Sequence, residues 1–171
     1  MRNIWTALLV TMVVSPALGG QAPGKVSLTD VRAWQGTWVL DVMASGVGEA
    51  DAERKVVTLG PTWVRIDTHR TADAQPVALI YNLDGSPNVN PFGAGVAVTK
   101  LTRDGDAVML ETVFTVNNQA VTLNERVPLV PGLDLPVEVM LRVEHGYQGV
   151  APAGVRIPPN VSSVTKIYRK E

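Results

Sequence analysis

Residues 103–116 read RDGDAVMLETVFTV, and their pattern decides the class of fold. From position 107 onward, side chains alternate along the chain so that Val108, Leu110 and Phe114 share one face. Alternation with a period of two is typical of a β-strand with one buried side. The Asp104-Gly105 pair before it favours a tight turn, because glycine readily adopts positive φ angles. This stretch therefore predicts an antiparallel hairpin.

Similar runs recur along the rest of the chain, separated by clusters of glycine, proline, asparagine and aspartate. They predict about nine strands and no long helix, at 34–42, 53–59, 62–68, 76–81, 96–102, 107–116, 120–130, 137–145 and 162–169. A short helical turn over about 31–34 is expected first, with Thr29 or Asp30 as its cap. The segments 44–51, 86–95 and 146–159 are expected to be loops.

The short connections between these runs favour a meander, in which consecutive strands pair. A meander of eight or more strands is expected to close, because closure removes exposed sheet edges. The sequence therefore predicts an all-β fold, a single antiparallel up-and-down β-barrel of about eight or nine strands. A β-sandwich fits the same pattern and is the alternative.

The first residues have the organisation of a secretory signal peptide. Arg2 supplies positive charge, residues 4–14 are apolar, and residues 17–19 (ALG) are suited to a signal peptidase. We expect cleavage near Gly19 and export to the periplasm or the medium; an uncleaved anchor is the alternative, although the apolar run is short for a bilayer. The expected organisation is a signal peptide at 1–19, a flexible leader at 20–30 and one barrel domain at 31–171.

Composition argues against several classes of function. The 171 residues include 15 Lys and Arg against 16 Asp and Glu, a formal net charge of −1. Such a chain has no basic field, so we expect neither nucleic-acid binding nor stable membrane insertion. The chain contains no cysteine, which excludes disulfides, thiolate metal sites and a cysteine nucleophile. The sequence indicates no particular protein partner.

Three short motifs give the chain a resemblance to a known group of proteins. They are WQGTWVLD at 34–41, YNLDG at 81–85 and KIYRK at 166–170. With them the chain resembles the small exported lipocalin-like (calycin-type) β-barrel proteins of bacteria, most of which have no known function. The resemblance implies an up-and-down barrel with a cavity for a small, largely apolar ligand. It also implies a structural role for Gly36 and Trp38 near the barrel floor.

In a barrel of this size, inward side chains either fill the core or line one cavity. The candidates for cavity walls are Trp38, Tyr81, Met109 and Phe114. Phe92 falls in an expected loop, where it would act as a lid residue at the barrel mouth or fold back onto the core. Simple core packing is the alternative role for the wall candidates, because an apolar stripe on a strand is first of all a core stripe.

Patterns for catalysis or metal binding are weak. Asp67 and His69 share one strand face, and two histidines with a carboxylate could hold zinc if His145 lay nearby in space. Without a ligand-spaced motif, polar strand-end residues facing water are the simpler interpretation. No serine lies in a Gly-x-Ser-x-Gly elbow. We therefore expect no catalytic residue, no metal and no cofactor.

The sequence supports three functional hypotheses. The favoured one is a non-enzymatic exported barrel that binds a small apolar or amphipathic ligand. The second is an interaction or structural module of the envelope with a filled barrel. The third is an enzyme that uses His69 or His145, which would require a histidine in a cleft with a shifted pKa. The expected inward positions mix valine, threonine and alanine with few aromatic residues, which favours an interior with space.

Overall fold

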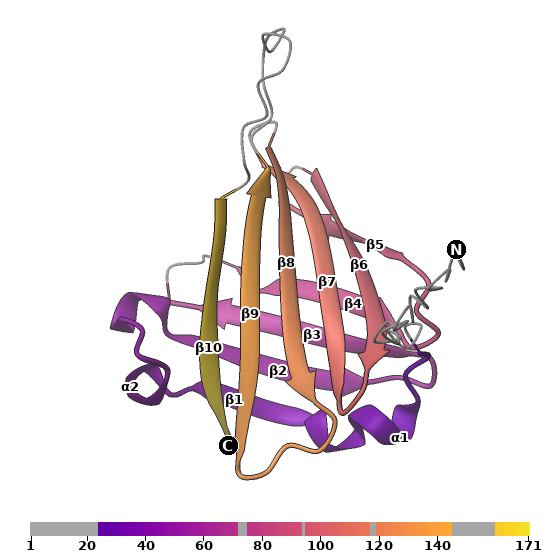
Figure 1. Ribbon diagram of the computed structural model, residues 1–171, viewed down its shortest axis with the longest axis horizontal. Helices are drawn as coiled ribbons and strands as arrows, with labels where there is room; N and C mark the ends of the chain where they lie inside the picture. The colour runs from indigo at the N-terminus through magenta and orange to yellow at the C-terminus, as the bar shows by residue number, and fades with distance from the viewer. Residues whose placement is uncertain (1–23, 72–74, 94, 117–118, 145–159) are drawn as a thin grey trace, which may run out of the picture.

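The chain forms one continuous antiparallel sheet that curls into a barrel (Figure 1). The structure, a computed structural model, describes residues 24–71, 75–93, 95–116, 119–144 and 160–171. The predicted signal peptide at 1–19 and His145 lie outside the described residues.

Ten strands make up the sheet, in the order β4-β3-β2-β1-β10-β9-β8-β7-β6-β5. Apart from β4 and β5, strands that follow one another along the chain pair in antiparallel ladders, and the first strand also pairs with the last. The predicted up-and-down barrel is confirmed, and the β-sandwich alternative is wrong because a single sheet holds every strand. The strands are β1 (Gly36–Leu40), β2 (Glu53–Leu59), β3 (Trp63–Arg70), β4 (Val77–Asn82), β5 (Asn88–Phe92), β6 (Gly95–Asp104), β7 (Ala107–Val116), β8 (Gln119–Pro128), β9 (Asp134–Glu144) and β10 (Asn160–Lys170).

The prediction of eight or nine strands was one short, because β5 lies within the expected loop 86–95. The sequence of this strand does not resemble a typical strand, because it contains two asparagines and Pro91, and these residue types are depleted in sheets. An edge strand tolerates them, because a proline there removes no ladder hydrogen bond that a central strand would need. The expected loop 44–51 likewise contains a helical turn, α2 (Val42–Ser45), and a 3₁₀ turn, η2 (Glu49–Asp51).

The two halves of the sheet cross, with β1–β4 behind and β6–β10 in front (Figure 1). The helix α1 (Leu28–Val31) and the 3₁₀ turn η1 (Arg32–Trp34) lie against one end of the barrel and form its floor. Ser27 caps α1 in a capping box with Asp30, so the cap lies just before the expected positions. Among the described residues, no helix has the length and apolar character needed to cross a membrane.

Buried tryptophans close the floor. The Trp34 indole N–H donates to the Pro128 carbonyl at 2.9 Å, and the Trp38 indole N–H donates to the Trp34 carbonyl at 2.8 Å. Gly36 has a φ of +127°, and a Cβ there would lie 3.0 Å from Cε of Lys170. Gly36 and Trp38 therefore have the structural place near the floor that the resemblance implied.

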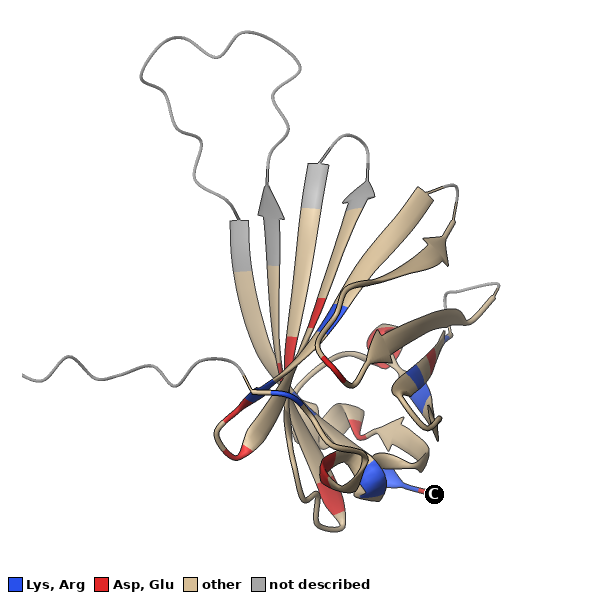
Figure 2. Ribbon diagram, turned by 90° about the vertical axis from the view of Figure 1, so that its right-hand side faces the viewer, with Lys and Arg blue, Asp and Glu red and all other residues tan. Residues whose placement is uncertain are grey.

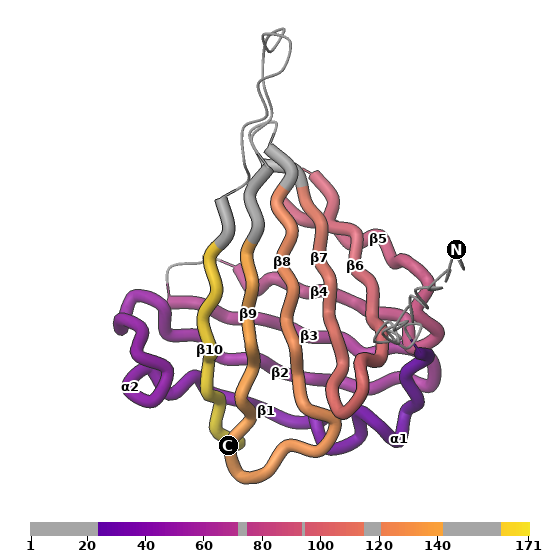
Figure 3. The backbone as a smooth tube through the Cα atoms, in the orientation of Figure 1, coloured from indigo at the N-terminus to yellow at the C-terminus, as the bar shows by residue number. Residues whose placement is uncertain are grey.

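The described part of the expected leader, from Gly24 onward, packs against the barrel. Gly24 pairs with Arg103 in an isolated bridge, and the Val26 N–H donates to the Leu83 carbonyl at 3.2 Å. Val26 is buried, which removes an apolar side chain from water and holds the segment in place. The path of the chain from this segment to the last strand can be followed in Figure 3.

The barrel closes between β4 and β5 through side chains instead of a backbone ladder. The carboxamide of buried Asn90 accepts the Ile80 N–H at 2.7 Å and donates to the Ile80 carbonyl at 3.2 Å. It also donates to the Thr99 hydroxyl at 2.9 Å. One amide side chain thus takes the place of a peptide group from a neighbouring strand, which satisfies backbone groups at a sheet edge.

We predict that Asn90→Ala lowers the free energy of unfolding by about 1–3 kcal/mol, because it leaves the Ile80 N–H without its acceptor, although the Ile80 carbonyl keeps the Asn88 and Thr99 side chains as donors. The matched control is Asn124→Ala on the outer face of β8, which should change stability by no more than about 0.5 kcal/mol. Urea denaturation followed by tryptophan fluorescence measures both. Equal stability of the two variants would contradict the role assigned to Asn90.

Candidate ligand-binding site

A cavity of about 1110 Å³ lies inside the barrel above the floor. Most of its wall is apolar and comes from strands on opposite sides of the barrel, with residues such as Leu79, Phe114, Leu123, Val139, Leu141 and Val164. A second void of about 30 Å³ lies deeper, among floor residues that include Trp34, Trp38 and Val137. The deeper void is about the size of one water molecule, so the larger cavity is the candidate site.

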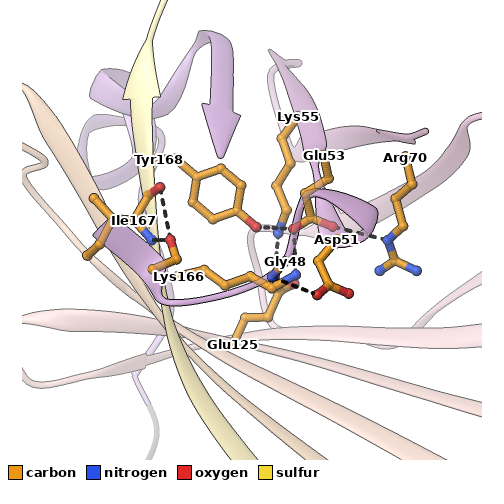
Figure 4. A network of polar contacts seen from close by, with 10 residues as sticks. Gly48, Asp51, Glu53, Lys55, Arg70, Glu125, Lys166, Ile167 and Tyr168 are labelled. Carbon is orange, nitrogen blue, oxygen red and sulfur yellow. Dashed lines mark hydrogen bonds and ion pairs between the residues drawn. The ribbon is translucent and has the colours of Figure 1, made fainter. Parts of the chain in front are cut away.

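The inner end of the cavity is polar, and Glu53 at the start of β2 is its central group (Figure 4). The Glu53 side chain is 2% exposed and accepts hydrogen bonds from three side chains. Lys166 donates at 2.9 Å, Arg70 Nε donates at 3.0 Å, and the Tyr168 hydroxyl donates to the same oxygen as Lys166. This carboxylate therefore joins β2, β3 and β10 inside the barrel.

A second ion pair crosses the barrel interior between β2 and β8. Lys55 donates to Glu125, and both side chains are largely buried. The Lys55 ammonium also lies 5.1 Å from the centre of the Tyr168 ring, within the range of a cation–π contact. Both ion-pair residues line the large cavity and the small void, so the pair separates the packed floor from the candidate site.

Two hydroxyl groups complete the polar end. The hydroxyls of Tyr81 on β4 and Thr112 on β7 lie 2.9 Å apart, and both residues line the cavity. Burial raises the pKa of Tyr81, and the nearby Glu125 carboxylate raises it further. Burial and the carboxylates Glu53 and Glu125 likewise raise the pKa of Tyr168. Both phenols therefore stay protonated, and the Tyr168 hydroxyl donates to Glu53.

The charges at this end hold one another in the ionised form. Burial raises the pKa of Glu53, but Lys55 and the hydrogen bonds from Tyr168 and Lys166 outweigh it and lower the pKa to about 2. Burial acts to lower the pKa of Lys55, yet Glu125 and Glu53 raise it overall. At neutral pH the inner end is therefore a set of compensated charges.

The structure places three of the five predicted site residues on the cavity wall. Tyr81, Phe92 and Phe114 line it, and the rings of Phe92 and Phe114 lie with their centroids 4.9 Å apart. Phe92 belongs to β5, not to a loop. Trp38 lines the small void at the floor and not the cavity, because the Lys55–Glu125 pair lies between the two spaces. Met109 is half-buried on the opposite face of β7 from Leu110 and Thr112.

The histidine positions do not form a centre within the described chain. His69 is exposed on β3 and does not line the cavity. The residues on either side of it in the sequence, Thr68 and Arg70, do line the cavity. Among the residues that the structure describes, no group of three histidine, aspartate or glutamate side chains could hold a metal ion.

Sequence reasoning missed the charged residues at the inner end of the site. One signal for them exists, because strand alternation places Glu53 and Lys55 on the same face as buried Val57. Glu125 is likewise two residues from buried Val127, and Lys166 is two residues from buried Tyr168. Charged residues at inward positions of three strands were thus visible, but their mutual pairing was not.

The chain was compared with known proteins. No family model and no curated protein matches it. A secretory abundant heat soluble (SAHS) protein of Ramazzottius varieornatus shares 12% identity at a TM-score of 0.52, over 81% of this chain and 96% of that one. SAHS protein 4 of the same organism shares 11% identity at a TM-score of 0.51, over 81% and 95%. Fatty-acid-binding protein 1 of Echinococcus granulosus shares 13% identity at a TM-score of 0.48, over 81% and 98%.

The two SAHS structures show that the chain shares their fold, and in this chain that fold is an antiparallel β-barrel. The fold expected from the three sequence motifs is therefore confirmed at this level. A shared fold does not carry function with it, so the function has to be argued from the site.

The lowered pKa of Glu53 predicts an acid-sensitive fold. Because its pKa is about 2 in the folded state and about 4.5 in the unfolded state, the unfolded chain binds this proton first. The contribution of the ionised Glu53 to the free energy of unfolding is complete above about pH 4.5 and is lost as the pH falls toward 2. Glu53→Gln should flatten that part of a plot of unfolding free energy against pH. Glu111→Gln, on the outer face of β7, should keep the wild-type slope; an unchanged slope in Glu53→Gln would contradict the assignment.

Proposed function

We propose that this protein binds a small hydrophobic or amphipathic molecule inside its barrel. The observation that carries the proposal is the cavity of about 1110 Å³, which has mostly apolar walls and a polar inner end. Small-molecule sites are typically apolar concavities with a few polar groups that orient the ligand. Protein interiors are otherwise close-packed, so a space of this size favours a binding role over a purely structural barrel.

The polar groups favour binding over catalysis. The described charged side chains at the inner end are engaged with one another, as Glu53 is with Lys166 and Lys55 is with Glu125. A nucleophilic or acid–base mechanism needs a reactive group whose proton can be transferred to a substrate. The exposed His69 faces away from the cavity, which gives no support to the enzyme hypothesis based on that residue.

A bulky substitution on the cavity wall should weaken binding. We predict that Val139→Trp, on the cavity wall, lowers the affinity for the neutral fluorescent probe N-phenyl-1-naphthylamine by about tenfold or more. The next residue, Met140, is exposed on the outer face of the same strand, so Met140→Trp is the matched control. Fluorescence titration measures both. Equal affinity in the two variants would place the probe elsewhere and contradict an internal site.

Native mass spectrometry of protein purified from its own host then identifies the natural ligand class. We expect a stoichiometric organic adduct that is lost on unfolding. The Val139→Trp variant should lack the same adduct, whereas Met140→Trp should retain it. An adduct of equal occupancy in both variants would show that the barrel cavity is not its binding site.

We also propose that the protein is exported after cleavage near Gly19, on the basis of the apolar run at 4–14 and the small residues that follow it. Expression of the full chain in a bacterium should then give a shortened protein in the periplasmic fraction, with a new N-terminus within a few residues of Gly20. Leu9→Arg should block this processing, and Leu9→Ile should not. Intact-mass measurement decides, and an unprocessed wild-type chain in the cytoplasm would contradict export.

A further inference from the structure

The charges around the cavity are nearly balanced by the chain itself. Five described charged side chains line it, namely Glu53, Lys55, Arg70, Glu125 and Lys166. The Arg70 side chain is 50% exposed, so water screens its charge. The four inner groups comprise two carboxylates and two ammonium groups, and each is within an ion pair. The described inner end thus adds no net charge of its own.

The place where an anion would bind is already taken by a side chain. Glu53 accepts hydrogen bonds from the Tyr168 hydroxyl, the Lys166 ammonium and Arg70 Nε. These are the donor types that would otherwise hold the carboxylate of a bound acid. Because Glu53 is tethered to the barrel, it occupies this position at a high effective concentration.

An ionised ligand head would therefore meet an unfavourable environment. It would enter beside the carboxylates of Glu53 and Glu125 while their cations are engaged, and like charges repel strongly where water is excluded. A neutral head needs only hydrogen bonds. The hydroxyls of Tyr81, Thr112 and Thr68 line the cavity and can each donate or accept one.

Resting on the proposed function, we infer that the barrel selects neutral amphipathic ligands, with a hydroxyl or carbonyl head, over ionised acids of the same chain length. The head group lies inward at the Tyr81 and Thr112 hydroxyls, and the apolar chain extends along walls such as Leu123, Val139 and Leu141. Glu53 sets this preference, because its own carboxylate already occupies the donors that would otherwise bind the carboxylate of an acid.

The test is a displacement titration in which myristyl alcohol and myristic acid compete with bound N-phenyl-1-naphthylamine. At about pH 8 the acid is ionised in water, so the two competitors differ in head-group charge. The wild-type protein should bind the alcohol about tenfold more tightly than the acid, or better. Glu53→Gln should raise the affinity for the acid about tenfold and change that for the alcohol by less than about threefold. Glu111→Gln, which removes the same charge from the outer face of β7, should leave both affinities unchanged.

The outcomes separate the two proposals. If wild-type protein binds the acid as tightly as the alcohol, the preference for neutral ligands is overturned while internal binding stands. If neither competitor nor probe binds, the proposed function fails and this inference with it. If Glu53→Gln folds but still rejects the acid, Glu53 does not set the preference. Should that variant lack a cooperative unfolding transition, the wild-type comparison of alcohol and acid decides alone.

Discussion

A carboxylate persists inside a protein only when donors surround it, and Glu53 on β2 draws its donors from two other strands. Its partners come from β3 and β10, and β1 lies between β10 and its own strand. The hydrogen bonds to Lys166 and Tyr168 therefore reach past β1 across the inner surface of the sheet and join β2 to β10. A shift of one residue in the register of β10 would turn both side chains outward. The carboxylate thus specifies how the barrel is assembled as well as what its interior presents.

The charged side chains at the inner end of the cavity form a polar layer, made of Glu53, Lys55, Glu125 and Lys166. This layer divides the interior into a packed floor and a large cavity. Below it, Trp34 and Trp38 pack a floor in which almost no space remains. Above it, apolar side chains surround the large cavity, and Figure 2 shows few charged residues on the described upper parts of β6–β10. The Lys55–Glu125 pair lies between the two and lines both. Burying a layer of charges costs desolvation free energy, but it gives the cavity a polar end that can orient a ligand.

Alternation along single strands was enough to predict the architecture, because one buried face is a local property that a stretch such as 107–116 displays by itself. The same reasoning found Tyr81 and Phe114 on the cavity wall, since both are large inward residues of strands. It missed β5, because asparagine and proline, which are depleted in sheets, make up three of its five residues. It also missed the polar layer, because Lys55 and Glu125 are 70 residues apart and no local pattern connects them. Pairings of that kind depend on the closed barrel and become visible only in three dimensions.

The ladder between β1 and β10 affects how the protein folds. Leu40 on β1 lies opposite Tyr168 on β10, so the barrel can close only after β10 has been synthesised. Contacts this distant in sequence raise the contact order, and folding slows accordingly. Until β10 docks, the edges of β1 and β9 remain available to other chains, which is the hazard that accompanies slow β-sheet assembly. The same docking step brings Lys166 and Tyr168 to Glu53, so the polar inner end of the cavity is complete only when β10 is in place.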